Sequence, residues 1–92
     1  MIHEWDATKA EQNLKKHGVS FNEATAVFRD PFALTIPDPD HSHGEERFVT
    51  IGLTTEQQSV TVVHTDRGEA IRLISARPAT PKERPEYEEA KP

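Results

Sequence analysis

The chain has 92 residues, no cysteine and a formal net charge of −5 at pH 7. A chain of this length has room for one small core, so we expect a single domain over residues 1–92. The absence of cysteine excludes disulfides, thiol catalysis and cysteine-ligated zinc. The acidic balance argues against extended, non-specific contact with nucleic-acid phosphates, although it leaves room for a small basic pocket.

The sequence carries no sign of a membrane or export segment. No apolar run approaches the roughly 20 residues of a membrane helix. The first residues lack both the basic and the apolar region of a signal peptide. The lack of cysteine also fits a reducing compartment. We therefore expect a cytoplasmic protein with no membrane partner.

Two helices are predicted in the first third of the chain. The first covers residues 7–16, with Asp6 as its N-cap and a glycine after its basic last turn. The second follows a capping box formed by Ser20 and Glu23. It ends at Asp30, because the residue before a proline is disfavoured in the helical region. The two segments predict a helical hairpin.

The middle of the chain changes to the two-residue period of strands. We expect strands over residues 32–36, 47–53, 60–65 and 70–77, with a tight turn over residues 66–69. Three successive strands with short links indicate an antiparallel meander. In the last strand, alternation places Ile71, Leu73 and Ser75 on one face and Arg72, Ile74 and Ala76 on the other.

A second capping box, Thr80 with Glu83, predicts a short C-terminal helix that starts with Pro81. Pro85 falls inside that helix and would kink it, restart it or prevent it. The expected fold class is therefore α+β, with an N-terminal helical hairpin packed on a four-strand, mainly antiparallel sheet and a short C-terminal helix.

The last strand hairpin carries side chains suited to phosphodiester cleavage. His64 could serve as a general base near neutral pH. Arg67, Arg72 and Arg77 could stabilise the charge that develops on a phosphate. A cross-strand network in which these arginines pair with acidic side chains explains the same residues, and spacing alone favours it.

Two further groups have both a functional and a structural interpretation. Lys9, Lys15, Lys16 and His17 could grip a phosphate backbone or an acidic protein, but cations in the last helical turn are expected without any ligand. His41 and His43 lie among carboxylates and invite a metal interpretation. Their loop lacks the rigidity and spacing of metal sites, so a solvated acidic turn is favoured and no metal site is predicted.

Three ordered groups of residues resemble the signature of the BrnT toxin family and together span nearly the whole chain. They are Trp5-Asp6, Lys9, Asn13, Lys16-His17-Gly18-Val19 and Phe21; Gly44-Glu45, Arg47 and Gly52; and Val62-Val63-His64-Thr65, Arg67, Arg72-Leu73-Ile74-Ser75-Ala76-Arg77, Ala79, Glu83 and Tyr87.

The resemblance implies a RelE-like fold and a ribonuclease toxin of a type II toxin–antitoxin system. Such a toxin would cleave RNA without a metal or other cofactor and inhibit translation. Its partners would be RNA and a cognate BrnA-like ribbon-helix-helix antitoxin. It would bind operator DNA only through that antitoxin. Carried over by position, the candidate catalytic residues are His64, Arg67 and Arg77, and the candidate RNA-binding residues are Lys9, Lys16, His17 and Arg72.

A second interpretation assigns the same fold to the chain but only weak catalytic activity. The acidic tail and Pro85 suit a RelE-like binding module that acts mainly in antitoxin pairing and operator co-repression. Expression without the antitoxin separates the two hypotheses, because only an active toxin arrests growth.

Overall fold

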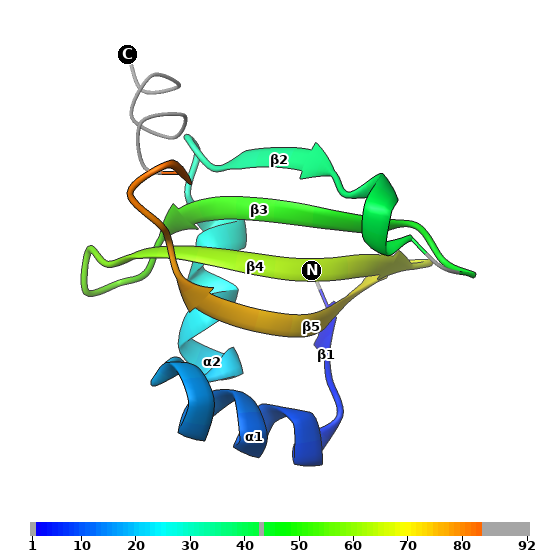
Figure 1. Cartoon of the computed structure of the whole chain (residues 1–92), viewed down its shortest axis with the longest axis horizontal. Helices are drawn as coiled ribbons and strands as arrows, with labels where there is room; N and C mark the ends of the chain where they lie inside the picture. The colour runs from blue at the N-terminus through cyan, green and yellow to red at the C-terminus, as the bar shows by residue number, and fades with distance from the viewer. Residues whose placement is uncertain (1, 43, 84–92) are drawn as a thin grey trace.

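The computed structural model describes residues 2–42 and 44–83, and its elements follow one another as labelled in Figure 1. They are β1 (Ile2–Glu4), α1 (Ala7–His17), α2 (Phe21–Ala24), the 3₁₀ segment η1 (Thr25–Arg29), β2 (Leu34–Pro37), the 3₁₀ turn η2 (Pro39–His41), β3 (Arg47–Leu53), β4 (Ser59–Arg67) and β5 (Ala70–Pro78). The predicted C-terminal helix beyond Glu83, with Pro85, lies outside the described residues.

The sheet has five strands in the order β1-β5-β4-β3-β2, so the expected four-strand sheet is wrong by one strand. The additional strand is β1, which pairs in parallel with the start of β5, whereas all other neighbours are antiparallel. With only three residues, β1 is too short to show an alternating pattern in the sequence. The predicted β3 is confirmed, and β4 and β5 extend so far that their turn contains only Gly68 and Glu69.

The helical hairpin forms as predicted at its start and differs at its end. The Asp6 side chain caps α1, and Ser20 and Glu23 form the reciprocal capping box of α2. From Thr25 onward the second helix tightens to a 3₁₀ helix. The Thr25 hydroxyl donates to the carbonyl of Asn22, three residues back, which favours the tighter turn.

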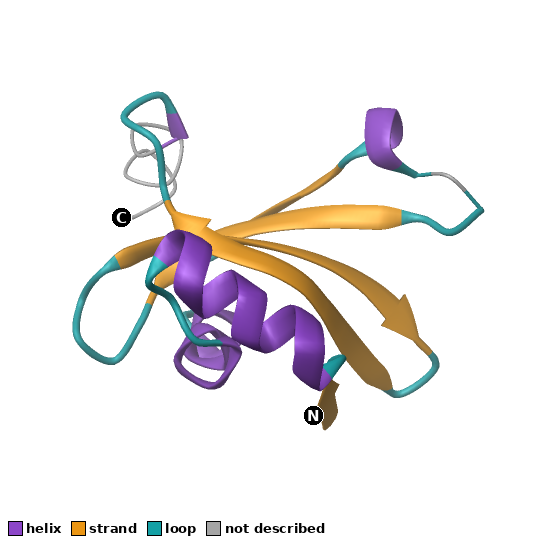
Figure 2. Cartoon of the chain, turned by 60° about the horizontal axis from the view of Figure 1, so that its bottom comes forward, coloured by secondary structure: helices purple, strands orange, loops and turns teal. Residues whose placement is uncertain are grey.

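Both helices cover the same face of the sheet, as Figure 2 shows, and we call this the helix-covered face. Its core joins helical and strand residues: Val19, Phe21, Ala24 and Val27 with Val60, Val62, Leu73 and Ala76. We call the opposite side the open face. It carries the side chains that alternate with those of the core.

A β-bulge in β5 overturns the strict alternation predicted for that strand. Ser75 lies opposite Val63, but Leu73 lies opposite His64, so Ile74 is an extra residue in the ladder. As a result Leu73 and Ala76 both enter the core. Arg77, opposite Thr61, is thereby placed on the open face.

The buried side chain of Asn13 fixes α1 to β5 next to this bulge. Its amide donates to the carbonyls of Ala76 (2.8 Å) and Val19 (2.9 Å), and its oxygen accepts from the Ala76 N–H (3.1 Å). A side chain thus completes strand hydrogen bonding where β1 no longer covers the edge of β5.

Candidate functional site

Arginines gather on the open face of the sheet. Arg47 and Arg72 both lie opposite Thr65 in the strand register, and Arg77 lies opposite Thr61. Arg67 follows Thr65 by two positions and continues the same face. The chain is acidic overall, but this face concentrates the groups that suit phosphate.

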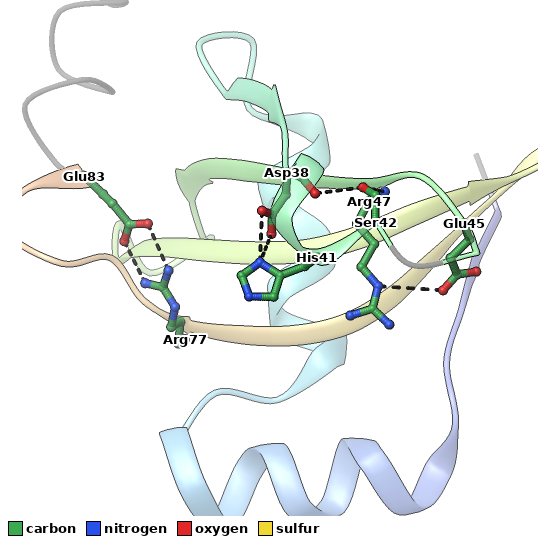
Figure 3. A network of polar contacts seen from close by, with 7 residues as sticks. All are labelled: Asp38, His41, Ser42, Glu45, Arg47, Arg77 and Glu83. Carbon is green, nitrogen blue, oxygen red and sulfur yellow. Dashed lines mark hydrogen bonds and ion pairs between the residues drawn. The ribbon is translucent and has the colours of Figure 1, made fainter.

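A groove of about 320 Å³ runs over the open face between η2 and β5. It is lined by Asp38, His41, Arg47, Val49, Val63, Ile74, Ser75 and Arg77. In Figure 3 the imidazole of His41 lies between the guanidinium groups of Arg77 and Arg47. The groove therefore combines a potential proton acceptor with two potential phosphate ligands.

Glu83 holds Arg77 at one end of this groove. The two side chains form a bidentate ion pair, with nitrogen–oxygen distances of 2.7 and 3.0 Å. The same carboxylate accepts from the Thr61 hydroxyl and the Thr80 N–H, and the reciprocal bond from the Glu83 N–H completes the predicted capping box. The hydrogen bond to Arg77 is the main reason why the pKa of Glu83 falls to about 2, and it raises the pKa of Arg77.

Asp38 orients His41 above the groove. Its carboxylate oxygens lie 2.9 and 3.0 Å from His41 Nδ1. The turn that carries both residues is bonded to the start of β3: the Asp38 N–H donates to the Arg47 carbonyl, and the Arg47 N–H donates to Ser42 Oγ. Ser42 Oγ in turn donates to the Asp38 carbonyl (2.7 Å), as Figure 3 shows in part.

Arg67 and Arg72 lie at the β1 side of the open face, separate from Arg77. Together with Glu4, Trp5 and Asp6 they line a groove of about 240 Å³. Arg67 Nε lies 3.6 Å from a Glu4 carboxylate oxygen. The two arginines are therefore brought together, but in a groove of their own.

The cations predicted on the first helix border the other side of β5. Lys9, Lys16 and His17 line a groove of about 190 Å³ with Gln12, Asn13, Ile74 and Ser75. The bulge residues Ile74 and Ser75 line this groove and the groove of His41 as well. One continuous surface thus leads from α1 across the bulge to Arg77.

His64 lies on the opposite side of the sheet from Arg77. Its ring stacks on Phe48, contacts Phe28 edge-on, and its Nε2 lies 2.7 Å from the Thr50 hydroxyl. Burial lowers the pKa of His64, although Asp66, 3.9 Å from Nδ1, opposes the shift. The structure therefore does not bring together the predicted catalytic set of His64, Arg67 and Arg77.

Two residues of the groove were missed by the sequence prediction, which considered His41 only as a metal ligand and Arg47 only as part of a family signature. The spacing of Asp38 and His41 around Pro39 is a signal for a turn that pairs the two side chains. Within residues 2–42 and 44–83, no three histidine or acidic side chains converge on a metal position, and His43 lies outside that part.

No helix in the described part of the chain is long and apolar enough to cross a membrane. None of the curated protein sequences matches this chain significantly. A crystal structure at 1.1 Å resolution of the Brucella abortus ribonuclease toxin BrnT is similar: it shares 26% sequence identity, the match covers 87% of this chain and 99% of that one, and the TM-score is 0.69.

The family model described as the ribonuclease toxin BrnT of type II toxin–antitoxin systems matches residues 5–83. This range contains both helices, strands β2 to β5 and every residue that lines the grooves described above except Glu4. The chain therefore belongs to the BrnT family of ribonuclease toxins of type II toxin–antitoxin systems.

Proposed function

We propose that the protein cleaves RNA on the open face of its sheet, without a metal ion, and thereby inhibits translation in the cytoplasm. The observation that carries this proposal is the groove in which Arg47 and Arg77 flank His41. A guanidinium fork matches the oxygens of a phosphodiester and stabilises the charge of the pentavalent transition state. Attack by the neighbouring 2′-hydroxyl needs no metal and restricts the reaction to RNA.

Arg77 is the strongest candidate for the phosphate ligand at the cleaved bond. Its bidentate bond to Glu83 fixes the guanidinium plane and uses one N–H of each terminal nitrogen. Arginine carries five donors, and the remaining N–H groups make no hydrogen bond within residues 2–42 and 44–83, so they can meet a phosphate. Pre-orientation of this kind lowers the entropic cost of binding.

The other predicted basic residues extend the surface along which an RNA strand could bind. Lys9, Lys16 and His17 line a neighbouring groove that meets the groove of His41 at Ile74 and Ser75. Arg72 lies further along the open face, beside the predicted catalytic residue Arg67. We assign them to neighbouring phosphates, which add salt-dependent affinity without contacting the reacting bond.

The sequence prediction that His64 is the general base stays a proposal, and its placement counts against it. The side chain is 5% exposed, and its Nε2 is already bonded to Thr50. Contact with an RNA hydroxyl would require Phe28 or Phe48 to move away. A role in supporting the sheet beneath the groove fits these contacts better.

We also propose a cognate BrnA-like antitoxin with a ribbon-helix-helix domain, which neutralises the toxin and carries the complex to its operator.

One observation favours the alternative of a catalytically weak binding module. Arg47, Arg67 and Arg77 each lie within 4 Å of a carboxylate, at 3.8, 3.6 and 2.7 Å. A toxin that folds but does not arrest growth without its antitoxin would support that alternative.

The test is cleavage of total RNA by the purified, antitoxin-free protein in the presence of a chelator. We expect the natural sequence to cleave and Arg77→Ala to lose about 10²–10³-fold in rate, as for removal of a charge-stabilising donor. Lys15→Ala is the matched control, because this exposed cation of α1 pairs with Glu11 and lines none of the grooves described above. Equal rates for Arg77→Ala and the natural sequence would contradict the site.

A further inference from the structure

We propose that His41 is the general base of RNA cleavage and that Asp38 is its positioning residue. The inference rests on the proposed function and goes beyond it by naming the group that removes the proton. The groove contains four ionisable side chains among its lining residues: Asp38, His41, Arg47 and Arg77. Both arginines are permanently charged donors, and both carboxylate oxygens of Asp38 are already bonded to His41. This leaves His41 as the side chain suited to accept a proton near neutral pH.

The bond from Asp38 selects one tautomer of the neutral imidazole. A carboxylate 2.9 Å from Nδ1 can only accept a hydrogen bond, so in the neutral ring the proton lies on Nδ1 and the lone pair lies on Nε2. Within the described residues, Nε2 of His41 has no hydrogen-bond partner. The ring is thus oriented at one nitrogen and available at the other.

The backbone around this pair is held to the sheet that carries the phosphate ligands. Asp38 and Ser42 exchange hydrogen bonds with the backbone of Arg47, so the turn cannot move without the first residue of β3. The His41 N–H also donates to the Asp38 carbonyl (3.2 Å), which closes the 3₁₀ turn. A base placed on such a turn is held relative to the backbone of Arg47, from which one phosphate ligand of the groove extends.

The two histidines considered as the general base, His41 and His64, differ in the exposure of their side chains. The His41 side chain is 69% exposed, whereas that of His64 is 5% exposed. Only His41 shares its groove with Arg47 and Arg77. Access to substrate and proximity to phosphate ligands therefore both favour His41.

The chemical step balances with these groups and solvent alone. Nε2 of His41 takes the proton of the ribose 2′-hydroxyl while that oxygen forms a bond to phosphorus. The bond from phosphorus to the 5′-oxygen breaks, and water supplies the proton that the leaving oxygen takes up. The products are a 2′,3′-cyclic phosphate and a free 5′-hydroxyl, and the imidazolium then returns its proton to water.

The experiment compares single-turnover cleavage of one RNA oligonucleotide by the natural full chain and by variants. We expect His41→Ala to lose about 10²–10⁴-fold in rate, as for removal of a general base, with RNA affinity unchanged. Added imidazole should restore part of the rate of His41→Ala but not that of Arg77→Ala. Asp38→Ala should lower the single-turnover rate at saturating protein and leave the affinity for RNA unchanged, because it disturbs the orientation of the base rather than contact with RNA.

Asp40→Asn is the matched control, because this neighbouring carboxylate lies on the same turn and makes no hydrogen bond or ion pair to His41 within the described residues. It should cleave at the natural rate. Full activity of His41→Ala beside an inactive Arg77→Ala would overturn the inference and leave the proposed function intact. Loss of activity in His64→Phe alone, in a folded sample, would return the role of base to His64. A natural sequence that cleaves no RNA would overturn both proposals.

Discussion

The two faces of the sheet use histidine in opposite ways. On the helix-covered face His64 is enclosed by Phe28 and Phe48, and its ring serves as a packing element with one hydrogen bond. On the open face His41 stands above the sheet, and within the described residues its ring is hydrogen-bonded at Nδ1 alone. Burial makes the first histidine a contributor to stability, and exposure beside arginines makes the second a candidate for chemistry.

The register of a strand determines which face of the sheet a reactive side chain lies on, and therefore which groups it can act with. His64 and Arg77 both lie on the central hairpin, and their residue types suggested a joint site. The sheet separates them, because His64 shares its face with Leu73 whereas Arg77 shares its face with Thr61. Changes on the helix-covered face should therefore alter stability, and changes on the open face should alter activity.

The largest effect on stability is expected from Asn13→Ala. The change removes three hydrogen bonds and leaves the backbone of Ala76 and the carbonyl of Val19 buried without partners. Each of these three groups costs roughly 1–3 kcal/mol, so the free energy of unfolding should fall by at least about 3 kcal/mol. Urea denaturation followed by fluorescence of Trp5 measures it.

Asn13→Asp sharpens this test, because it keeps the acceptor for the Ala76 N–H and loses both donated bonds. Its stability should be closer to that of Asn13→Ala than to that of the natural sequence. A loss below 1 kcal/mol in both variants would mean that α1 is held to β5 by apolar packing instead.

A moderate loss of stability is expected from Gly52→Ala on the helix-covered face. An added Cβ would lie 2.9 Å from Val27 Cγ1 and 3.2 Å from the Val27 carbonyl. Val27 is fully buried and has little room to move, so overpacking should cost about 1–3 kcal/mol. Thermal unfolding measures the loss, and RNA cleavage by the folded fraction should stay unchanged.

Val27→Ala tests the cause, since it removes the nearest clashing atom. The double variant Gly52→Ala/Val27→Ala should lose less stability than the sum of the losses in the two single variants, which a double-mutant cycle detects. Strict additivity would show that the Cβ of residue 52 is accommodated in another way.

The sequence predicted the parts of the fold that depend on local signals. The caps at Asp6 and Ser20 and the alternation of β3 are local, and all three are confirmed. The parallel strand β1 and the bulge at Ile74 depend on contacts with distant residues, above all Asn13 with Ala76, and leave no local pattern. That bulge decides the face of Arg77, so the candidate site could be predicted in its residue types but not in its grouping.

A smaller, pH-dependent effect should distinguish the helix-covered face in solution. Burial lowers the pKa of His64 and, together with nearby positive charge that includes Arg29, that of His3, and both rings contact Phe28. The folded state therefore favours the neutral rings, whereas the unfolded chain binds protons near the ordinary pKa of 6.5. Stability should be full above pH 6.5 and fall as the pH drops below it.

His64→Phe should flatten the fall in stability just below pH 6.5, because it removes one of the two titrating rings and leaves the partly buried ring of His3. A separate loss, between about pH 4.5 and 2, should come from Glu83, whose pKa is lowered to about 2 in the folded state. Glu83→Gln should remove this second loss and leave the first. Unfolding by urea at a series of pH values measures both, and equal stability of the natural sequence at pH 7 and 5 would contradict the first.

The smallest effect is expected at the edge of the open face, from Lys9→Ala and Lys16→Ala. If each lysine contacts one phosphate of a single strand, each change should reduce the slope of log affinity against log salt by about 0.7. The rate of cleavage at saturating RNA should hardly change, because neither ammonium lies in the groove of His41. Lys15→Ala, on the outer side of the same helix, should leave the slope unchanged. If all three variants keep the slope of the natural sequence, RNA contacts the open face and not α1. The cations of α1 would then serve only to stabilise the last turn of the helix.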